Sequence, residues 1–215
     1  MCLPQPQRRP PYQRSNLGVV GTDRKILEVL AIGDPLPHLG DAQPEIRRLA
    51  AAACAPLGST AFEPLSTVAA NDPDDEVRAE AVEVLGALGP IAYDTVRARC
   101  DDASTRVIEA ATTALGEIGE PAAVPWLIET SRGHENQLVR EAAIAALGSI
   151  GDDRALPTLL EAVAAGKPQI RRRAVVALTA FEGPDVEAAF TAARLDRNPM
   201  VREVAEMVLG RSAEG

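Results

Sequence analysis

Aromatic side chains are scarce in this chain: Phe, Trp and Tyr make up 3% of its 215 residues, although 46% of the residues are hydrophobic. The apolar content therefore comes from alanine, leucine, valine and isoleucine. Such a composition suits thin helices that pack closely against one another. The length is enough for one domain of ordinary size.

Cysteine and histidine are also few, which argues against the usual covalent and metal frameworks. Cys2, Cys54 and Cys100 show no paired spacing, so we expect neither a disulfide framework nor a thiolate metal site. The two histidines, His38 and His134, lie far apart in the sequence. The sequence contains no glycine-rich phosphate loop and no nucleophile elbow, and its Ser, His and Asp residues are too scattered for a triad. We therefore predict no catalytic residue, no metal and no cofactor.

Long apolar runs and basic stripes are missing as well. No segment approaches the roughly 18 consecutive apolar residues of a membrane span, and no apolar stretch of signal-peptide length follows the basic N-terminus. The formal net charge is −9, and no basic stripe is present that could neutralise the phosphates of a nucleic acid. We expect a soluble, cytoplasmic protein with no nucleic-acid partner and no membrane partner.

What the chain does have is a short phrase that returns at an almost constant interval. An aliphatic residue is usually followed by arginine, then by alanine, then by Leu-Gly and a second glycine, as in the segment 77–89. A period in the range of roughly 20–50 residues indicates a stacked repeat. Such a stack offers a long surface without a guaranteed deep pocket, which makes catalysis less expected. The copies begin at intervals of 31, 30, 32, 31 and 31 residues, at Ile46, Val77, Val107, Val139, Ile170 and Val201.

Each full repeat is expected to form two helices. In the first helix, Val77, Ala81 and Leu85 share one face, and the central alanine lets neighbouring helices come close. Gly86 and Gly89 are expected to end that helix, because glycine tolerates the left-handed conformation. The second helix follows a short turn, and its apolar positions align between repeats, as at Phe62, Tyr93, Val124, Leu156 and Val186.

This pattern resembles the HEAT repeat, in particular the short bacterial form named after phycobilisome lyases. The resemblance rests on the aliphatic-Arg start, the central alanine, the Leu-Gly-x-Ile-Gly ending and the second-helix segment 123–127, Ala-Val-Pro-Trp-Leu. It implies an all-α fold, a right-handed α-solenoid of about five to six two-helix HEAT-like repeats. It does not imply one particular function, because the same fold serves many unrelated roles.

The same pattern sets the expected boundaries. Residues 1–21 are basic and proline-rich without periodic apolar residues, so we predict a disordered tail. We expect residues 22–43 to form a degenerate N-terminal capping unit and residues 44–215 to form the HEAT-repeat solenoid. In the fifth repeat the segment 178–182 replaces Leu-Gly-x-Ile-Gly, so a bend is expected there, and the sixth repeat has one helix only.

The arginine near the start of most repeats predicts a structural ladder. In proteins with this repeat, such arginines pair with acidic turn residues, and here Asp75 could serve Arg78. The third repeat has Ile108 at this position, so the ladder is interrupted there. We expect these arginines to stack the repeats rather than to bind a ligand: Arg47, Arg78, Arg140, Arg171 and Arg202.

The second helices are where we expect the function to lie. In proteins that resemble this one they line the inner, concave face. Trp126 lies at an outward position in the middle of this face, and Thr158 is another outward position. A solvated helix face is one interpretation; the other is a groove for a basic peptide or protein surface, with Trp126 as its anchor. The sequence leaves open whether Trp126 is exposed. The predicted groove carries one acid per repeat: Glu63, Asp94, Glu129, Glu161 and Glu187.

A non-enzymatic scaffold that binds a protein partner is the function that the sequence favours, as a monomer or weak dimer. A bilin-lyase-like enzyme, or an accessory subunit of one, is the alternative, although a tetrapyrrole needs large apolar walls and aromatic residues are few. HEAT-like DNA glycosylases need a basic concave face, which an acidic stripe does not provide. HEAT-like deoxyhypusine hydroxylases need repeated His-Glu pairs, and only His134-Glu135 occurs here.

Overall fold

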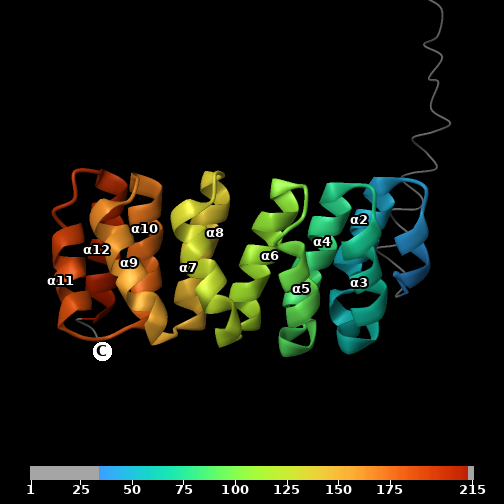
Figure 1. Cartoon of the computed structure of the whole chain (residues 1–215), viewed down its shortest axis with the longest axis horizontal. Coiled ribbons are helices and arrows are strands. Elements are labelled where there is room, and N and C mark those ends of the chain that lie inside the picture. The colour runs from blue at the N-terminus through green and yellow to red at the C-terminus, as the bar shows by residue number, and fades with distance from the viewer. Residues whose placement is uncertain (1–33, 213–215) are drawn as a thin grey trace, which may run out of the picture.

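The computed structural model describes residues 34–212, with side chains up to Gly210, and this part of the chain contains helices and turns only. The helices stand side by side in a row along the long axis of the molecule (Figure 1). The predicted α-solenoid of two-helix repeats is confirmed. The first helices are α2 (Pro44–Ala53), α4 (Asp75–Gly86), α6 (Thr105–Ile118), α8 (Gln137–Ile150), α10 (Pro168–Ala177) and α12 (Pro199–Ser212). The second helices are α3 (Phe62–Asn71), α5 (Tyr93–Arg99), α7 (Val124–Gly133), α9 (Leu156–Ala165) and α11 (Pro184–Ala193).

The first and second helices form two layers, and the aliphatic positions of the repeat fill the space between them. Val77, Leu85 and Leu115 are fully buried on the first helices, and Leu127 and Leu159 on the second helices. At about 25 cal/mol for each Å² of apolar area removed from water, this continuous core is the main stabilising contribution. Short 3-10 turns lead into the second helices: η2 (Ala55–Ala61), η3 (Gly89–Ala92), η4 (Pro121–Ala123), η5 (Asp153–Ala155) and η6 (Leu178–Ala180).

The two glycines of the repeated phrase have different roles. The second one ends the first helix in the left-handed conformation, with φ of 76° at Gly119 and 67° at Gly151. The first one lies inside α6 and α8 at Gly116 and Gly148, so these helices run on past it. A Cβ at Gly116 would lie 2.7 Å from the Cα of Ala146 on the next first helix. In α6 and α8 the first glycine therefore allows a close approach of two helices rather than a helix end, whereas α4 ends at Gly86 as expected.

The close approach recurs along the layer of first helices. A Cβ at Gly86 would lie 2.7 Å from the Cβ of Ala114, and a Cβ at Gly148 would lie 2.6 Å from the Cα of Ala177. Glycine packed on alanine brings two backbones nearer than any larger pair allows. The helices α4, α6, α8 and α10 are consequently in extensive contact with their neighbours in the row.

The layer of second helices is spaced more widely than the layer of first helices. The helix pairs α5–α7 and α7–α9 make only marginal backbone contact, and cavities open between them. We call the exposed side of the second helices the second-helix face. That this face is the inner, concave side of the stack stays a prediction.

The two ends of the solenoid depart from the regular repeat. In the fifth repeat, α10 has 10 residues instead of the 14 of α8, and the chain continues as the 3-10 turn η6 where a bend is expected. At the other end, the short helix η1 (Leu36–Gly40) packs on α2 and buries Leu39. The predicted tail and the first part of the predicted capping unit lie outside the described residues.

Candidate functional site

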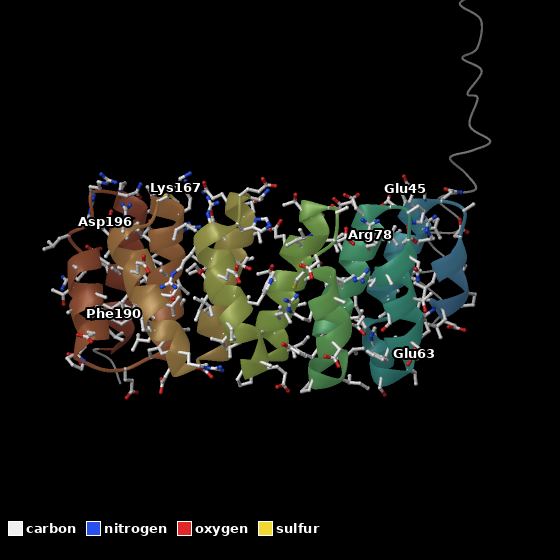
Figure 2. All side chains as sticks on the ribbon, in the orientation of Figure 1. Glu45, Glu63, Arg78, Lys167, Phe190 and Asp196 are labelled. Carbon is white, nitrogen blue, oxygen red and sulfur yellow. The ribbon has the colours of Figure 1, made fainter. Side chains whose placement is uncertain are left out.

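A ladder of arginine–aspartate pairs joins the turns that connect the second helices to the first helices of the next repeat. At one rung, Arg78 donates from Nε and one terminal nitrogen to both carboxylate oxygens of Asp102, at 3.1 and 2.9 Å. Its other terminal nitrogen donates to the carbonyl oxygen of Asp72, at 2.8 Å. The ladder runs along the edge of the stack where Arg78 and Asp196 are labelled in Figure 2.

The partner predicted for Arg78 is wrong. The ladder acid is Asp102 in the following turn, whereas Asp75 accepts a hydrogen bond from the Ser104 hydroxyl at 2.6 Å. Arg47, Arg78 and Arg171 therefore each reach forward by one repeat, and at these rungs the ladder links successive repeats as expected. Counting from the N-terminus, the five rung positions are Arg47–Asp72, Arg78–Asp102, Ile108–His134, Arg140–Gly166 and Arg171–Asp196.

The ladder aspartates are held as carboxylates. Burial on its own would raise the pKa values of Asp72 and Asp102, but hydrogen bonds from Arg47 and Arg78 outweigh burial, and both pKa values lie below the usual range. The hydrogen bonds from Arg171 are the largest influence on Asp196 and lower its pKa as well. These ion pairs are largely shielded from water, so each stabilises the junction of two repeats.

We expect the stability of the protein to be lost on acidification. The pKa of each of these carboxyl groups is lower in the folded protein than its unfolded value of about 3.9. Such a group stabilises the fold fully above its unfolded pKa, and this stability is lost as the pH falls through its folded pKa. The urea midpoint should therefore be nearly constant from pH 7 to about pH 5 and fall below about pH 4. Urea unfolding followed by circular dichroism measures this. A variant with Asp72, Asp102 and Asp196 changed to Asn should show a flatter profile, and an equal fall in both proteins would contradict the assignment.

Two central rungs of the ladder lack one or both partners. At the third rung Ile108 replaces the arginine and His134 replaces the aspartate; the His134 Nδ1 accepts from the backbone N–H of Asn136 at 3.1 Å, as the ladder aspartates do for their own turns. At the fourth rung Arg140 donates to the carbonyl oxygens of His134 and Glu135, and Gly166 stands where the acid would be.

The cavities on the second-helix face coincide with these two rungs. A cavity of about 510 Å³ lies at the third rung, between the end of α5 and α7, and Ile108, Trp126, Glu129 and His134 are among its lining residues. A smaller cavity of about 290 Å³ lies at the fourth rung, between α7 and α9. At the complete rungs an arginine–aspartate pair fills the equivalent place, whereas at the third and fourth rungs one or both of the paired side chains are missing.

Trp126 is half-buried and packs against the core, which answers the question that the sequence left open. The guanidinium carbon of Arg97, on the neighbouring helix α5, lies 5.0 Å from the centre of its ring, within the range of a cation–π contact. Arg97 also pairs with Asp101 at 3.6 Å. The indole is therefore fixed between α5 and α7, with part of it lining the cavity at the third rung.

The acids predicted for the second helices are all exposed, on one face of each helix. Glu129 forms no ion pair within residues 34–212, whereas Glu161 pairs with Arg132 at 2.9 Å. The acids do not form a single row. Glu129 and Glu161 lie one helical turn further along than the other three, a rise of about 6 Å. The acids of the first turns are Glu63, Asp94 and Glu187.

Thr158 is buried, with 4% of its surface exposed, so the prediction that it faces outward is wrong. It lines the cavity at the fourth rung together with Ser131 of α7 and Ile144 of α8. A single-helix projection missed this because the neighbouring helices cover the position. The cavity at the third rung is not predicted from the sequence. One signal is present, because Ile108 interrupts the ladder. The sequence alone does not show that His134 stands opposite it.

The other chemical groups do not form a reactive site in the described part of the chain. Burial raises the pKa of the Cys54 thiol to about 11 and that of the Cys100 thiol to about 12, so both stay protonated. Within residues 34–212, no group of three or more His, Cys, Asp and Glu side chains could hold a metal ion. The helices in this range are also too short or too polar to cross a membrane.

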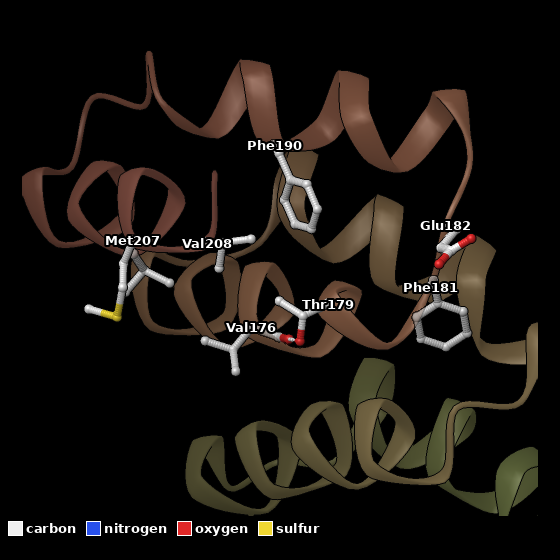
Figure 3. Close-up of a pocket in the computed structure, with 8 residues that line it drawn as sticks. Val176, Thr179, Phe181, Glu182, Phe190, Met207 and Val208 are labelled. Atoms are coloured by element: carbon white, nitrogen blue, oxygen red, sulfur yellow. Dashed lines mark hydrogen bonds between the residues drawn. The ribbon is translucent and has the colours of Figure 1, made fainter. Parts of the chain in front are cut away.

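A third cavity, of about 490 Å³, lies at the C-terminal end between α10, α11 and α12 (Figure 3). Phe190 of α11, Val176 of α10 and Met207 of α12 line it, with Phe181 at its edge. Met207 and Val176 are about half exposed, at 55% and 49%. This apolar surface is exposed because no second helix follows α12 within the described residues.

The comparisons with known proteins agree with this architecture. The family model for HEAT repeats matches residues 34–112, 62–132 and 93–179. No curated protein sequence matches the chain. Several solved structures share the fold, at identities that are too low to indicate function.

Three of those structures illustrate the likeness. The complex of CpcE and CpcF of phycocyanin lyase from Nostoc sp. is 21% identical, with a TM-score of 0.65, 82% of this chain covered and 74% of that one. The YibA protein of E. coli is 19% identical, with a TM-score of 0.61 and coverages of 94% and 76%. A designed armadillo repeat protein in complex with the peptide (KR)4 is 17% identical, with a TM-score of 0.58 and coverages of 84% and 98%.

The sequence period, the two-layer stack and the three overlapping family matches lead to one conclusion, namely that this chain belongs to the HEAT repeat family.

Proposed function

We propose that this protein is a non-enzymatic interaction scaffold that binds a protein partner with a basic surface on its second-helix face. The observation that carries the proposal is the set of five exposed acids on five successive second helices, beside open cavities at the centre of the same face. A solenoid presents such a face over its whole length, which suits an extended partner. Acids spaced along it favour rapid approach and selection of a basic surface.

The charges of the face support a partner of this kind but limit where it binds. Arg132 pairs with Glu161, and Arg97 lies over Trp126, so the acids that can meet a basic partner are Glu129, which forms no ion pair within residues 34–212, and those in the first turns of α3, α5 and α11. The designed armadillo protein offers a parallel in another helical repeat, because its structure contains the basic peptide (KR)4. The second-helix face, which we expect to form the concave groove of the stack, is the face that we assign to the partner. A cytoplasmic location and a monomeric or weakly dimeric state remain part of this proposal.

A bilin-lyase-like enzyme or accessory subunit is the second candidate. The likeness of fold to the CpcE and CpcF complex favours it, and so does the apolar cavity that Phe181 and Phe190 line at the C-terminal end. Titration with a bilin, followed by its absorption spectrum, distinguishes the two functions. A red-shifted, saturable spectrum at a one-to-one ratio would favour this candidate over the scaffold.

The experiment that tests the scaffold is a pull-down from native lysate with identification by mass spectrometry. The wild type is compared with a variant in which Glu63, Asp94, Glu129 and Glu187 are changed to the matching amides, which keeps size and removes charge. We expect partners with basic segments to be retained by the wild type and lost by the variant. Partners retained equally by both proteins would move the binding site to another face.

Replacing Trp126 with alanine separates binding from folding. Because the ring is half-buried, its loss should cost less stability than the 3–5 kcal/mol of a buried aromatic residue, about 1–2 kcal/mol. Binding of the partner should weaken by on the order of 2 kcal/mol, the loss typical of an interface hot spot. Urea unfolding and a binding titration measure the two effects, with Trp126→Phe as a control that keeps an aromatic ring. Unchanged binding together with a destabilised fold would contradict a role for Trp126 in recognition.

A further inference from the structure

The third rung of the ladder lacks both the arginine and the aspartate, and the complete rungs show which hydrogen bonds are missing there. At the second rung, the aliphatic part of Arg78 crosses the turn, and its guanidinium meets both oxygens of Asp102 and the carbonyl oxygen of Asp72. The equivalent carbonyl at the third rung is that of Asp102. No described residue donates a hydrogen bond to this oxygen, because Ile108 stands where the arginine would be. An acceptor for a guanidinium is thus present without its donor.

The space of the missing side chain is open to solvent. The cavity of about 510 Å³ at this rung is lined by apolar Ile108, by the aromatic ring of Trp126 and by Asp102, among others. His134 occupies the place of the ladder aspartate, and its Nδ1 is already engaged with the Asn136 N–H. The negative charge that a guanidinium needs is supplied by Glu129, which lines the same cavity, is exposed and forms no ion pair with a described residue.

We propose that the cavity at the third rung binds an arginine side chain of the protein partner, in the place that the chain's own arginine occupies at the complete rungs. The guanidinium donates to the carbonyl oxygen of Asp102 and to the carboxylate of Glu129. The methylene groups pack between Ile108 and the ring of Trp126. This inference rests on the proposed function and names the side chain that the partner contributes.

Arginine fits this cavity better than lysine for two reasons. A planar fork of donors reaches a carbonyl and a carboxylate at once, as Arg78 does one repeat earlier. The charge is also less strongly hydrated, so it costs less to move into a partly enclosed site. The site therefore selects arginine within a basic segment.

Fluorescence of Trp126 provides a direct test, because it is the only tryptophan of the chain and lines the cavity. The probes are three octapeptides in which glycine alternates with arginine, lysine or citrulline. We expect the arginine peptide to change the fluorescence and to bind at least about tenfold more tightly than the lysine peptide, with still weaker binding of the citrulline peptide, which has the same shape without the charge.

The decisive variant completes the rung from within the chain. In the double variant Ile108→Arg/His134→Asp, the new arginine occupies the cavity. The arginine peptide should therefore bind at least about tenfold more weakly than it binds the wild type. The melting temperature of the variant should rise, because the substitutions add a rung to the ladder. Glu129→Gln, at an exposed position that forms no ion pair within residues 34–212, should weaken binding by about the same factor without altering the fold. Glu45→Gln, an exposed acid on α2 in the other layer, is the matched control and should bind as the wild type does.

The outcomes separate this inference from the proposed function. If Ile108→Arg/His134→Asp and Glu129→Gln bind the peptide as the wild type does, while Glu63→Gln/Glu187→Gln binds it less well, the second-helix face recognises basic segments but the cavity does not hold the arginine. In that case the inference is overturned and the proposed function stands. If none of the three peptides binds to the wild type, the inference and the basic-partner proposal both fail.

Discussion

Replacing Gly148 with alanine is expected to destabilise the protein by about 3 kcal/mol, the upper end of the usual cost of overpacking a core. The added Cβ would lie 2.6 Å from both the Cα and the Cβ of Ala177 and 3.1 Å from its carbonyl oxygen. Two of these three atoms belong to the backbone of α10, so no rotamer change relieves the contact. The two helices must move apart, and because α8 also packs on α6, the displacement loosens a second junction.

The same substitution at Gly133 is the matched control. That glycine also has ordinary helical backbone angles, in α7, and a Cβ there would have no neighbour within 4 Å. Gly133→Ala should therefore be neutral or stabilising by about 0.5–1 kcal/mol, the usual preference for alanine in a helix. Urea unfolding of both variants measures the difference. A cost at Gly148 no greater than at Gly133 would mean that α8 and α10 are farther apart than described.

The repeated phrase was sufficient to predict the two-helix repeat, because its apolar spacing and its period describe contacts within one repeat and between identical repeats. It did not distinguish the two glycines of the phrase. Both were expected to end the helix, and α4 does end at Gly86, but the equivalent Gly116 lies within α6, where Ala146 of the next repeat requires a residue without a side chain. A requirement set by a neighbouring helix leaves no local trace in the sequence around the glycine.

The same limit explains the other corrections. Asp75 is close to Arg78 in sequence, yet the arginine pairs with Asp102, because the side chain extends along the stack to the next turn. Thr158 faces outward on an isolated helix but is 4% exposed in the stack, where Ser131 of α7 and Ile144 of α8 line the same cavity. The sequence therefore predicted the exposed acids, whose positions depend on their own helix, better than it predicted the partners of the ladder or the burial of Thr158.

Replacing Arg171 with alanine is expected to cost about 3–5 kcal/mol, the range for breaking a buried ion pair by removing one partner. Arg171 is 4% exposed, and it donates twice to Asp196, at 2.6 Å each, and once to the carbonyl oxygen of Gly166, at 2.8 Å. Its loss leaves the carboxylate of Asp196 shielded from water with only the backbone N–H of Asn198 as a donor. Thermal or urea unfolding of the variant measures the cost.

Arg154 provides an unusually close control, because it makes the same three bonds on the surface. It donates twice to Asp152, at 2.8 Å each, and once to the carbonyl oxygen of Pro121, at 2.8 Å. Its side chain is 54% exposed, so water can replace each bond and Arg154→Ala should cost far less than Arg171→Ala. Equal costs for the two variants would show that the number of bonds, and not their burial, determines what a rung contributes.

The pH dependence of Arg171→Ala identifies the source of its cost. Arg171 lowers the pKa of Asp196, so at neutral pH the variant holds a carboxylate that has lost its main partner. As the pH falls through the pKa of that carboxyl group, the wild type loses the stability of the pair, whereas the variant gains from neutralising an unpaired charge. The difference between the two proteins should therefore shrink below about pH 4. A difference that stays constant down to pH 3 would assign the cost to the lost packing of the arginine side chain instead of to the charge of Asp196.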